Sequence, residues 1–314
     1  MNSPIVLVVV SSLLSCALAI AQSQTLVTTR TAQLPAAVAG KVAISSSHDV
    51  RCDSAGNVLF QLHGDDELLT PFVKVSPTGE LVAKITIGTL PNLDKAVIED
   101  FSLSPDGKIY FVVGKVNERD DWLLRFEADG RFVSESRLNV PDLSTVAFAP
   151  FASGSVLVLG HGPFAGIFSP AGDLLRDITH SADLSRSDVS LITRQGVTAQ
   201  VASDGNAYVL TGFQFPRVTI FTPSGDVKQT TLLAIKKDEG VVTGKFSDGK
   251  IAVSLASERG PSVAVFDALT GQLVGQYRSN QPPKAELVCY SDNQFTFLEN
   301  EGKLLRWASP SPTE

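Results

Sequence analysis

The sequence predicts an all-β protein built from repeated four-stranded units, and three observations support this. Short runs rich in β-branched and aromatic residues follow one another along the chain, turn motifs rich in Gly, Asp and Ser separate them, and these turns recur at a nearly constant spacing. No long amphipathic helical pattern competes with this interpretation. The stretch 101–138 contains one complete unit: FSLSP-DG-KIYFVV, a polar loop, and WLLRFEA-DG-RFVSESRL.

The first turn of each unit joins its first two strands. Its small residues, Asp and Gly supply the positive φ angles that a two-strand turn needs. The glycines of five such turns, at positions 56, 107, 154, 205 and 249, are 44 to 51 residues apart. A period of about 40–50 residues with four strands in each repeat is typical of β-propeller blades. The six first turns span 54–57, 105–108, 152–155, 203–206, 247–250 and 291–294.

The second turn of each unit joins its third and fourth strands. An apolar run precedes each of these turns and a strand-like run follows it, with turns at 76–79, 127–130, 169–172, 222–225 and 268–271. We therefore expect four-stranded antiparallel blades at about 50–87, 100–138, 145–179, 198–233, 243–279 and 286–309.

The sixth unit lacks its outer strand, because the chain ends in a Ser/Pro-rich tail after the third run. The segment 25–34, TLVTTRTAQL, could supply that strand and so remove an exposed sheet edge. The predicted fold is thus a six-bladed β-propeller whose N-terminal strand closes the last blade. The alternative is that this segment is a disordered tail.

The repeats resemble those of six-bladed propellers of the NHL-repeat and TolB-like group, over about residues 25–309. The resemblance depends on the form F-x-x-S-P-D-G-x-I-Y-F/V at 101–111, followed by L-x-x-F-x-x-x-G at 123–130. The Trp-Asp dipeptide of WD repeats and the double Gly of kelch repeats are absent. These motifs specify architecture and leave function open, because one scaffold hosts many activities.

The first 21 residues are read as a secretory signal peptide. They carry no charge, the run 5–14 is apolar apart from two serines, and Ala19-Ile20-Ala21 fits the small-residue rule for cleavage before Gln22. An uncleaved anchor would be short at about 17 apolar residues. Lipidation at Cys16 is a further alternative, but the apolar run continues past it. We expect a secreted or periplasmic propeller spanning 22–314, without a transmembrane span after cleavage.

Successive connections in a meander alternate between the two faces of a propeller. The tight first and second turns share one face, here called the turn face, and the longer connections share the other, here called the loop face. Binding residues concentrate on long loops above a rigid scaffold, so we place the site on the loop face, over the central channel. Its loops are 63–70, 114–121, 160–164, 212–217, 256–261 and 300–302, and its crossovers are 88–98, 139–144, 180–197, 234–242 and 279–285.

Ten residues on or beside these loops are candidate ligand-binding residues, and none is assigned to catalysis. Glu99 and Asp100 open a first strand, so a carboxylate could point into the channel mouth; the alternative is a solvated acidic rim. Lactonase-type six-bladed propellers hold a divalent cation there, and Ca²⁺ prefers such oxygen ligands. Phe213 and Phe215 beside Arg217 suit a protein or glycan partner, or pack over a neighbouring blade. The ten are His63, Asp65, Glu99, Asp100, Asp120, Asp121, His161, Phe213, Phe215 and Arg217.

Cys52 and Cys289 occupy equivalent places on the first strands of blades one and six, which are neighbours in the ring. A disulfide between them would join the first and sixth blades covalently, and an exported chain would allow it. A bridge needs Cα atoms within about 7 Å, and adjacent first strands are usually further apart. Two buried free thiols are the alternative.

Composition and missing motifs argue against several classes of partner and reaction. The formal charge is −7 and no Lys/Arg-rich block occurs, which argues against nucleic acid as a partner. No Gly-x-Ser-x-Gly elbow or phosphate-binding loop is present. We favour an exported, monomeric, non-catalytic scaffold that binds a protein, peptide or glycan through its loop face. The alternative is a Ca²⁺-assisted lactonase or esterase-like hydrolase with an acidic site at the channel mouth.

Overall fold

A computed structural model describes most of the chain. The described residues are 24–42, 50–66, 68–91, 93, 95–115, 120–140, 142–180, 184, 186–193, 197–211, 215–236, 238–247, 249–256, 261–278, 285–299 and 302–311. The segment predicted to be a signal peptide lies outside them.

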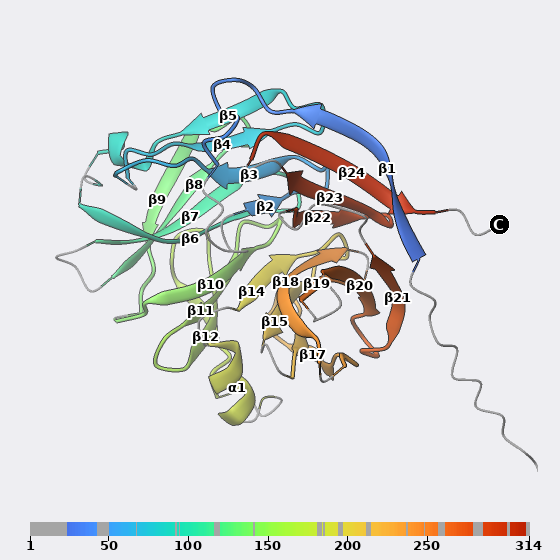
Figure 1. The fold of residues 1–314 in the computed structure, drawn as a ribbon. Helices are drawn as coiled ribbons and strands as arrows, with labels where there is room; N and C mark the ends of the chain where they lie inside the picture. The colour runs from blue at the N-terminus through green and yellow to red at the C-terminus, as the bar shows by residue number, and fades with distance from the viewer. Residues whose placement is uncertain are drawn as a thin grey trace, which may run out of the picture.

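Four separate antiparallel sheets follow one another in sequence, each a meander of four strands (Figure 1). The first is β2 (Val50–Cys52), β3 (Val58–Gln61), β4 (Phe72–Val75) and β5 (Leu81–Ile85). The second is β6 (Ala96–Leu103), β7 (Ile109–Lys115), β8 (Asp121–Phe126) and β9 (Phe132–Arg137). The third is β10 (Thr145–Pro150), β11 (Val156–Gly160), β12 (Phe164–Phe168) and β13 (Leu174–Asp177), and the fourth is β14 (Thr198–Val201), β15 (Ala207–Thr211), β16 (Arg217–Phe221) and β17 (Val227–Leu232).

A mixed eight-stranded sheet, here called the closing sheet, completes the ring in the order β18-β19-β20-β21-β1-β24-β23-β22. One half is β18 (Gly240–Ser247), β19 (Lys250–Ala256), β20 (Ser262–Asp267) and β21 (Leu273–Arg278). The other half is β22 (Glu286–Ser291), β23 (Gln294–Glu299), β24 (Leu304–Pro310) and β1 (Gln24–Gln33). The two halves meet where β1 pairs in parallel with β21 through Gln24 and Thr25.

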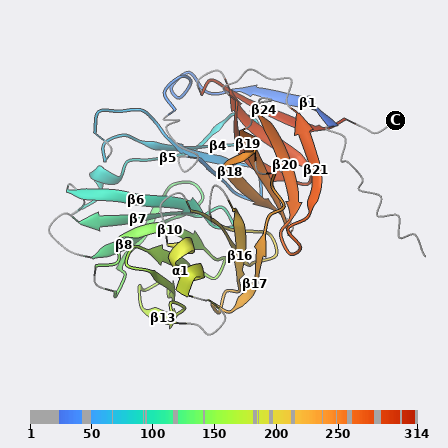
Figure 2. The ribbon, with the colours of Figure 1, turned by 60° about the horizontal axis from the view of Figure 1, so that its bottom comes forward.

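The N-terminal strand closes the ring, as the sequence predicts. β1 pairs antiparallel with β24 from Leu26 to Gln33, and the two strands lie side by side in both views (Figures 1 and 2). The expected fold class, an all-β propeller of four-stranded sheets with this closing strand, is confirmed. The structure has four separate four-stranded sheets and one eight-stranded sheet, so the count of six blades stays a prediction. The fifth and sixth repeats of the sequence are the two halves of the closing sheet.

Hydrophobic packing between neighbouring repeats holds the ring together. Six buried clusters exist among the described residues, and each joins one repeat to the next around the ring. The last cluster packs Val50 and Phe60 of the first repeat against Val288 and Trp307 of the sixth. Burying apolar surface on both sides of every sheet is the main stabilising contribution.

Short helical segments occur only in the crossovers of the described chain: η1 (Ile87–Thr89) and α1 (Arg186–Ile192). Val189 and Ile192 of α1 pack into the cluster between the third and fourth sheets, so this crossover is attached to the core. None of the described helices is long and apolar enough to cross a membrane.

Turn glycines let neighbouring repeats approach closely. Gly172 has φ +88°, and a Cβ there would overlap the carbonyl oxygen of Arg137 in the preceding repeat. The first turn of the sixth repeat has no Gly, and Asp292 and Asn293 adopt its positive φ angles, 48° and 57°. These residues tolerate the left-handed region better than most others.

Candidate functional site

The exposed candidates of the loop face come from separate repeats. His63 and Asp65 are exposed between β3 and β4, and His161 is exposed between β11 and β12. Phe215 is 75% exposed, whereas Phe213 lies outside the described residues. Arg217 forms an ion pair with Asp188 of α1, with 3.0 Å between Nη1 and Oδ1.

Asp100 lies inside the ring. Its Oδ1 is 2.9 Å from Nη2 of Arg51 on β2, and the two side chains are only 9% and 7% exposed. It also accepts a hydrogen bond from the backbone N–H of Phe101. Burial raises the pKa of Asp100, although the Arg51 guanidinium and the hydrogen bonds act in the opposite direction. Glu99, beside it, is exposed and lies at a register shift between β6 and β7.

Asp121 and Asp120 each have a partner in the scaffold. The buried Asp121 accepts hydrogen bonds from the backbone N–H and the hydroxyl of Thr145, at 2.9 and 2.6 Å. This links the second sheet to the third, and burial raises the pKa of Asp121. Asp120 forms an ion pair with Arg137 at 2.7 Å.

The acidic candidates therefore do not converge on one point. Within the part of the chain that the structure describes, no group of three or more His, Cys, Asp or Glu side chains is placed to hold a metal ion. A Ca²⁺ site at Glu99 and Asp100 stays a prediction, and it would have to draw Asp100 away from Arg51.

Lys245 is a buried cation that sequence reasoning missed. It extends from β18 in the fifth repeat and donates a hydrogen bond from Nζ to the carbonyl oxygen of Val50 in the first, at 2.9 Å. Burial, assisted by repulsion from Arg51, lowers the pKa of Lys245 to about 7, and Glu286 partly opposes this. The sequence feature that could have indicated it is a charged residue within a predicted first strand, Lys245 in β18 and Arg51 in β2.

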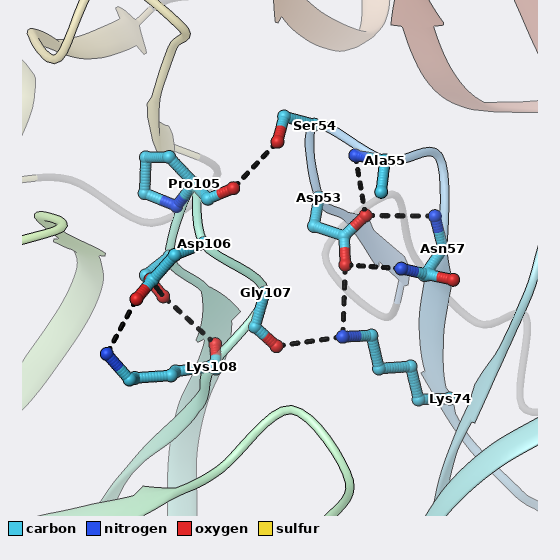
Figure 3. Close-up of polar contacts among 10 residues, drawn as sticks. Asp53, Ser54, Ala55, Asn57, Lys74, Pro105, Asp106, Gly107 and Lys108 are labelled. Atoms are coloured by element: carbon cyan, nitrogen blue, oxygen red, sulfur yellow. Dashed lines mark hydrogen bonds and ion pairs between the residues drawn. The ribbon is translucent and has the colours of Figure 1, made fainter.

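A second buried ion pair lies within the first repeat at the turn face, and its lysine also reaches the second repeat (Figure 3). Lys74 Nζ lies 3.0 Å from Asp53 Oδ2, with side chains 1% and 2% exposed, and it also donates to the carbonyl oxygen of Gly107 at 2.8 Å. The Asp53 carboxylate accepts further hydrogen bonds from the backbone of Ala55 and from Asn57. Every polar atom of this pair is thus satisfied within the scaffold, which indicates a structural role.

Two neighbouring cavities, which share lining residues, open on the turn face. The first, here called the central cup, has a volume of about 200 Å³ and lies among the ends of β2, β6, β14, β18 and β22. The second, here called the seam groove, has a volume of about 550 Å³ and lies between the first and sixth repeats. They share Cys52, Asp53, Ser54, Tyr290, Ser291 and Asp292.

Cys52 and Cys289 form a disulfide between the first and sixth repeats, with Cα atoms 5.8 Å apart. That spacing is within the range a bridge requires. The two first strands approach closely here, and both cysteines line the seam groove.

Comparison with known proteins shows the fold alone. No protein-family model and no curated protein matches this chain. A Bacteroides fragilis protein described as exported is similar in structure, with a TM-score of 0.50 and 11% identity over 92% of this chain and 98% of its own. The β-propeller domain of the Trilobed protease from Pyrococcus furiosus has a TM-score of 0.47 and 14% identity, covering 83% of this chain and 79% of that one. YCF48 bound to D1 peptide has a TM-score of 0.47 and 12% identity, over 91% and 96% of the chains.

Proposed function

We propose that this protein is an exported binding propeller that holds a protein, peptide or glycan ligand on its loop face. The observation that carries the proposal is Phe215, whose side chain is 75% exposed at the end of a loop. Aromatic residues and Arg are enriched in binding interfaces, where a large rigid ring supplies contact area at a low entropy cost. Arg217 lies two residues away and provides a charged donor.

The contacts of Arg217, two residues from Phe215, support a preformed surface. Arg217 begins β16, and its guanidinium pairs with Asp188 on α1, which is itself attached to the core through Val189. This ion pair therefore links the crossover that contains α1 to the start of β16. A surface that is already ordered loses less entropy when a ligand binds.

The test uses an array of synthetic glycans and a library of random peptides, probed with the purified protein starting at Gln22. We expect a specific binder whose affinity falls at least tenfold in Phe215→Ser and in Arg217→Gln. Leu175→Ser is the matched control, because Leu175 is 62% exposed on the outer strand β13, away from the loops. Absence of any binder, or equal loss in Leu175→Ser, would contradict the proposal.

We also propose that the protein is exported and that it is related to the NHL-repeat and TolB-like group. We expect the protein recovered outside the cytoplasm to begin at Gln22, as N-terminal sequencing would show. A mature chain that begins with a lipid-modified Cys16 would contradict cleavage after Ala21. The hydrolase alternative stays a prediction, and metal analysis together with thermal unfolding in chelator tests it.

A further inference from the structure

The central cup brings together equivalent positions of five repeats. In each, the first strand ends and its turn begins at the wall of the cup, and a Ser at or beside each turn adds a hydroxyl: Ser54, Ser104, Ser203, Ser247 and Ser291. Ser54 and Ser104 already donate to the carbonyl oxygen of Pro105 and to the Asp106 carboxylate, so these two hydroxyls offer their oxygen lone pairs as acceptors. Gln200 adds an amide, and Phe246 and Tyr290 add aromatic surface. The cup is thus a small cavity with hydrogen-bonding groups around its edge and apolar surface between them, the usual composition of a ligand site.

The charges of the cup have one sign. No Lys, Arg or His is among its described lining residues, whereas Asp53 and Asp292 both line it. Asp53 is neutralised by Lys74 and by the hydrogen bonds of its turn. Asp292 is exposed and enters no ion pair or hydrogen bond with the described residues, so its carboxylate is open to a ligand at the cup. A carboxylate beside a ring of hydroxyls attracts a cationic group.

The seam groove continues from Asp292 toward the outside of the ring. Thr29, Arg30 and Trp307 line its outer part, together with Pro77 of the first repeat. The Arg30 guanidinium lies 4.1 Å from the centre of the Trp307 ring and donates a hydrogen bond to the carbonyl oxygen of Pro77. Arg30 is therefore held in place, and its remaining N–H groups are donors suited to carbonyl oxygens.

We propose that the turn face is a second binding site, which takes a peptide segment with a Lys or Arg side chain. The basic side chain occupies the central cup beside Asp292. The peptide backbone follows the seam groove, where Arg30 donates to its carbonyl groups. A peptide fits better than a neutral glycan because the two neighbouring cavities present an open carboxylate and a fixed guanidinium on the same face. This site is separate from the loop face of the proposed function.

Titration calorimetry with capped peptides tests the proposal. The probes are acetyl-Ala-Ala-Arg-Ala-Ala-amide and the same peptide with citrulline, which keeps the shape of Arg without its charge. We expect the Arg peptide to bind at least tenfold more tightly than the citrulline peptide. Equal affinity for the two peptides, or no binding of either at millimolar concentration, would overturn the proposal.

Single substitutions test whether the Arg peptide binds at the central cup. Asp292→Asn should lower affinity for the Arg peptide at least tenfold, and Asn tolerates the left-handed backbone at this position. Asp129→Asn is the matched control, because Asp129 is an exposed turn Asp of the second repeat outside both cavities, and it should leave affinity unchanged. Phe215→Ser should also have no effect, which separates this site from the loop face. Equal losses of affinity in Asp129→Asn and Asp292→Asn would refute binding at the central cup. If Asp292→Asn does not fold, the comparison of the Arg and citrulline peptides on the wild type still tests the proposal.

Discussion

At the scale of single residues, the fully buried charges are the most informative. Lys74 and Asp53 are almost completely removed from water, and that transfer is costly unless each charge meets the other and every polar atom is hydrogen-bonded. The pair Lys108–Asp106 is close by in the second repeat, but its side chains are 32% and 39% exposed. The two pairs have similar geometry and should differ greatly in what their removal does.

We expect Lys74→Met to destabilise the protein by about 3–5 kcal/mol, because it leaves the Asp53 carboxylate buried without its cation. Lys108→Met should cost less than about 1 kcal/mol, because water screens an exposed pair. Urea unfolding followed by circular dichroism measures both free energies. Equal effects would contradict the structural role assigned to the buried pair.

Lys245 should make stability depend on pH. Its pKa falls from 10.5 to about 7 in the folded protein, so between these values the unfolded chain binds more protons than the folded one. Stability should therefore rise with pH from about 7 to 10, by at most about 1.4 kcal/mol per pH unit. Unfolding free energies measured from pH 6.5 to 9.5 should show this rise in the wild type and not in Lys245→Met. Parallel profiles for the two proteins would contradict it.

At the scale of elements, β1 has the largest structural consequence. It covers the edge of β24 from Leu26 to Gln33 and touches β21, so it connects the two ends of the described chain. Without it, β24 would present a row of unpaired N–H and C=O groups, which promotes pairing between molecules.

A chain that begins at Leu34, and so lacks β1, should unfold at a lower temperature and associate. The control begins at Gln24 and removes only the two residues that precede the strand after the expected cleavage. Thermal unfolding and size-exclusion chromatography compare the two. A monomeric, equally stable shortened chain would show that β1 is dispensable.

Element prediction succeeds where the signal is local. The strands follow from short runs of β-branched and aromatic residues and from turn residues such as Gly107, whose φ of 80° suits a hairpin connection. The short helix α1 was not expected, because its seven residues are too few to establish a helical period. Packing of Val189 and Ile192 against the third and fourth sheets stabilises it instead.

At the scale of the whole molecule, the disulfide and the cluster between the first and sixth repeats close the ring. Cys52 and Cys289 are 237 residues apart in sequence, so their bond constrains a very large loop in the unfolded chain.

Peptide mapping of the purified protein without reductant should recover a Cys52–Cys289 linked peptide. Reduction, or the double variant Cys52→Ser with Cys289→Ser, should lower the free energy of unfolding by about 2–4 kcal/mol. The control is reductant added to the double variant, which should cause no further change. Two free thiols in freshly isolated protein would contradict the bond.

The sequence by itself determined the repeats, the strands, the turns and the strand that closes the ring, because runs of β-branched and aromatic residues and turn chemistry act over a few neighbouring positions. Only the tertiary structure decided that Asp100 pairs with Arg51, that Lys245 reaches Val50 across 195 residues, and that cavities open on the turn face. These features depend on the ring, which brings the ends of first strands from distant repeats to a common axis. No local pattern records which side chains meet there.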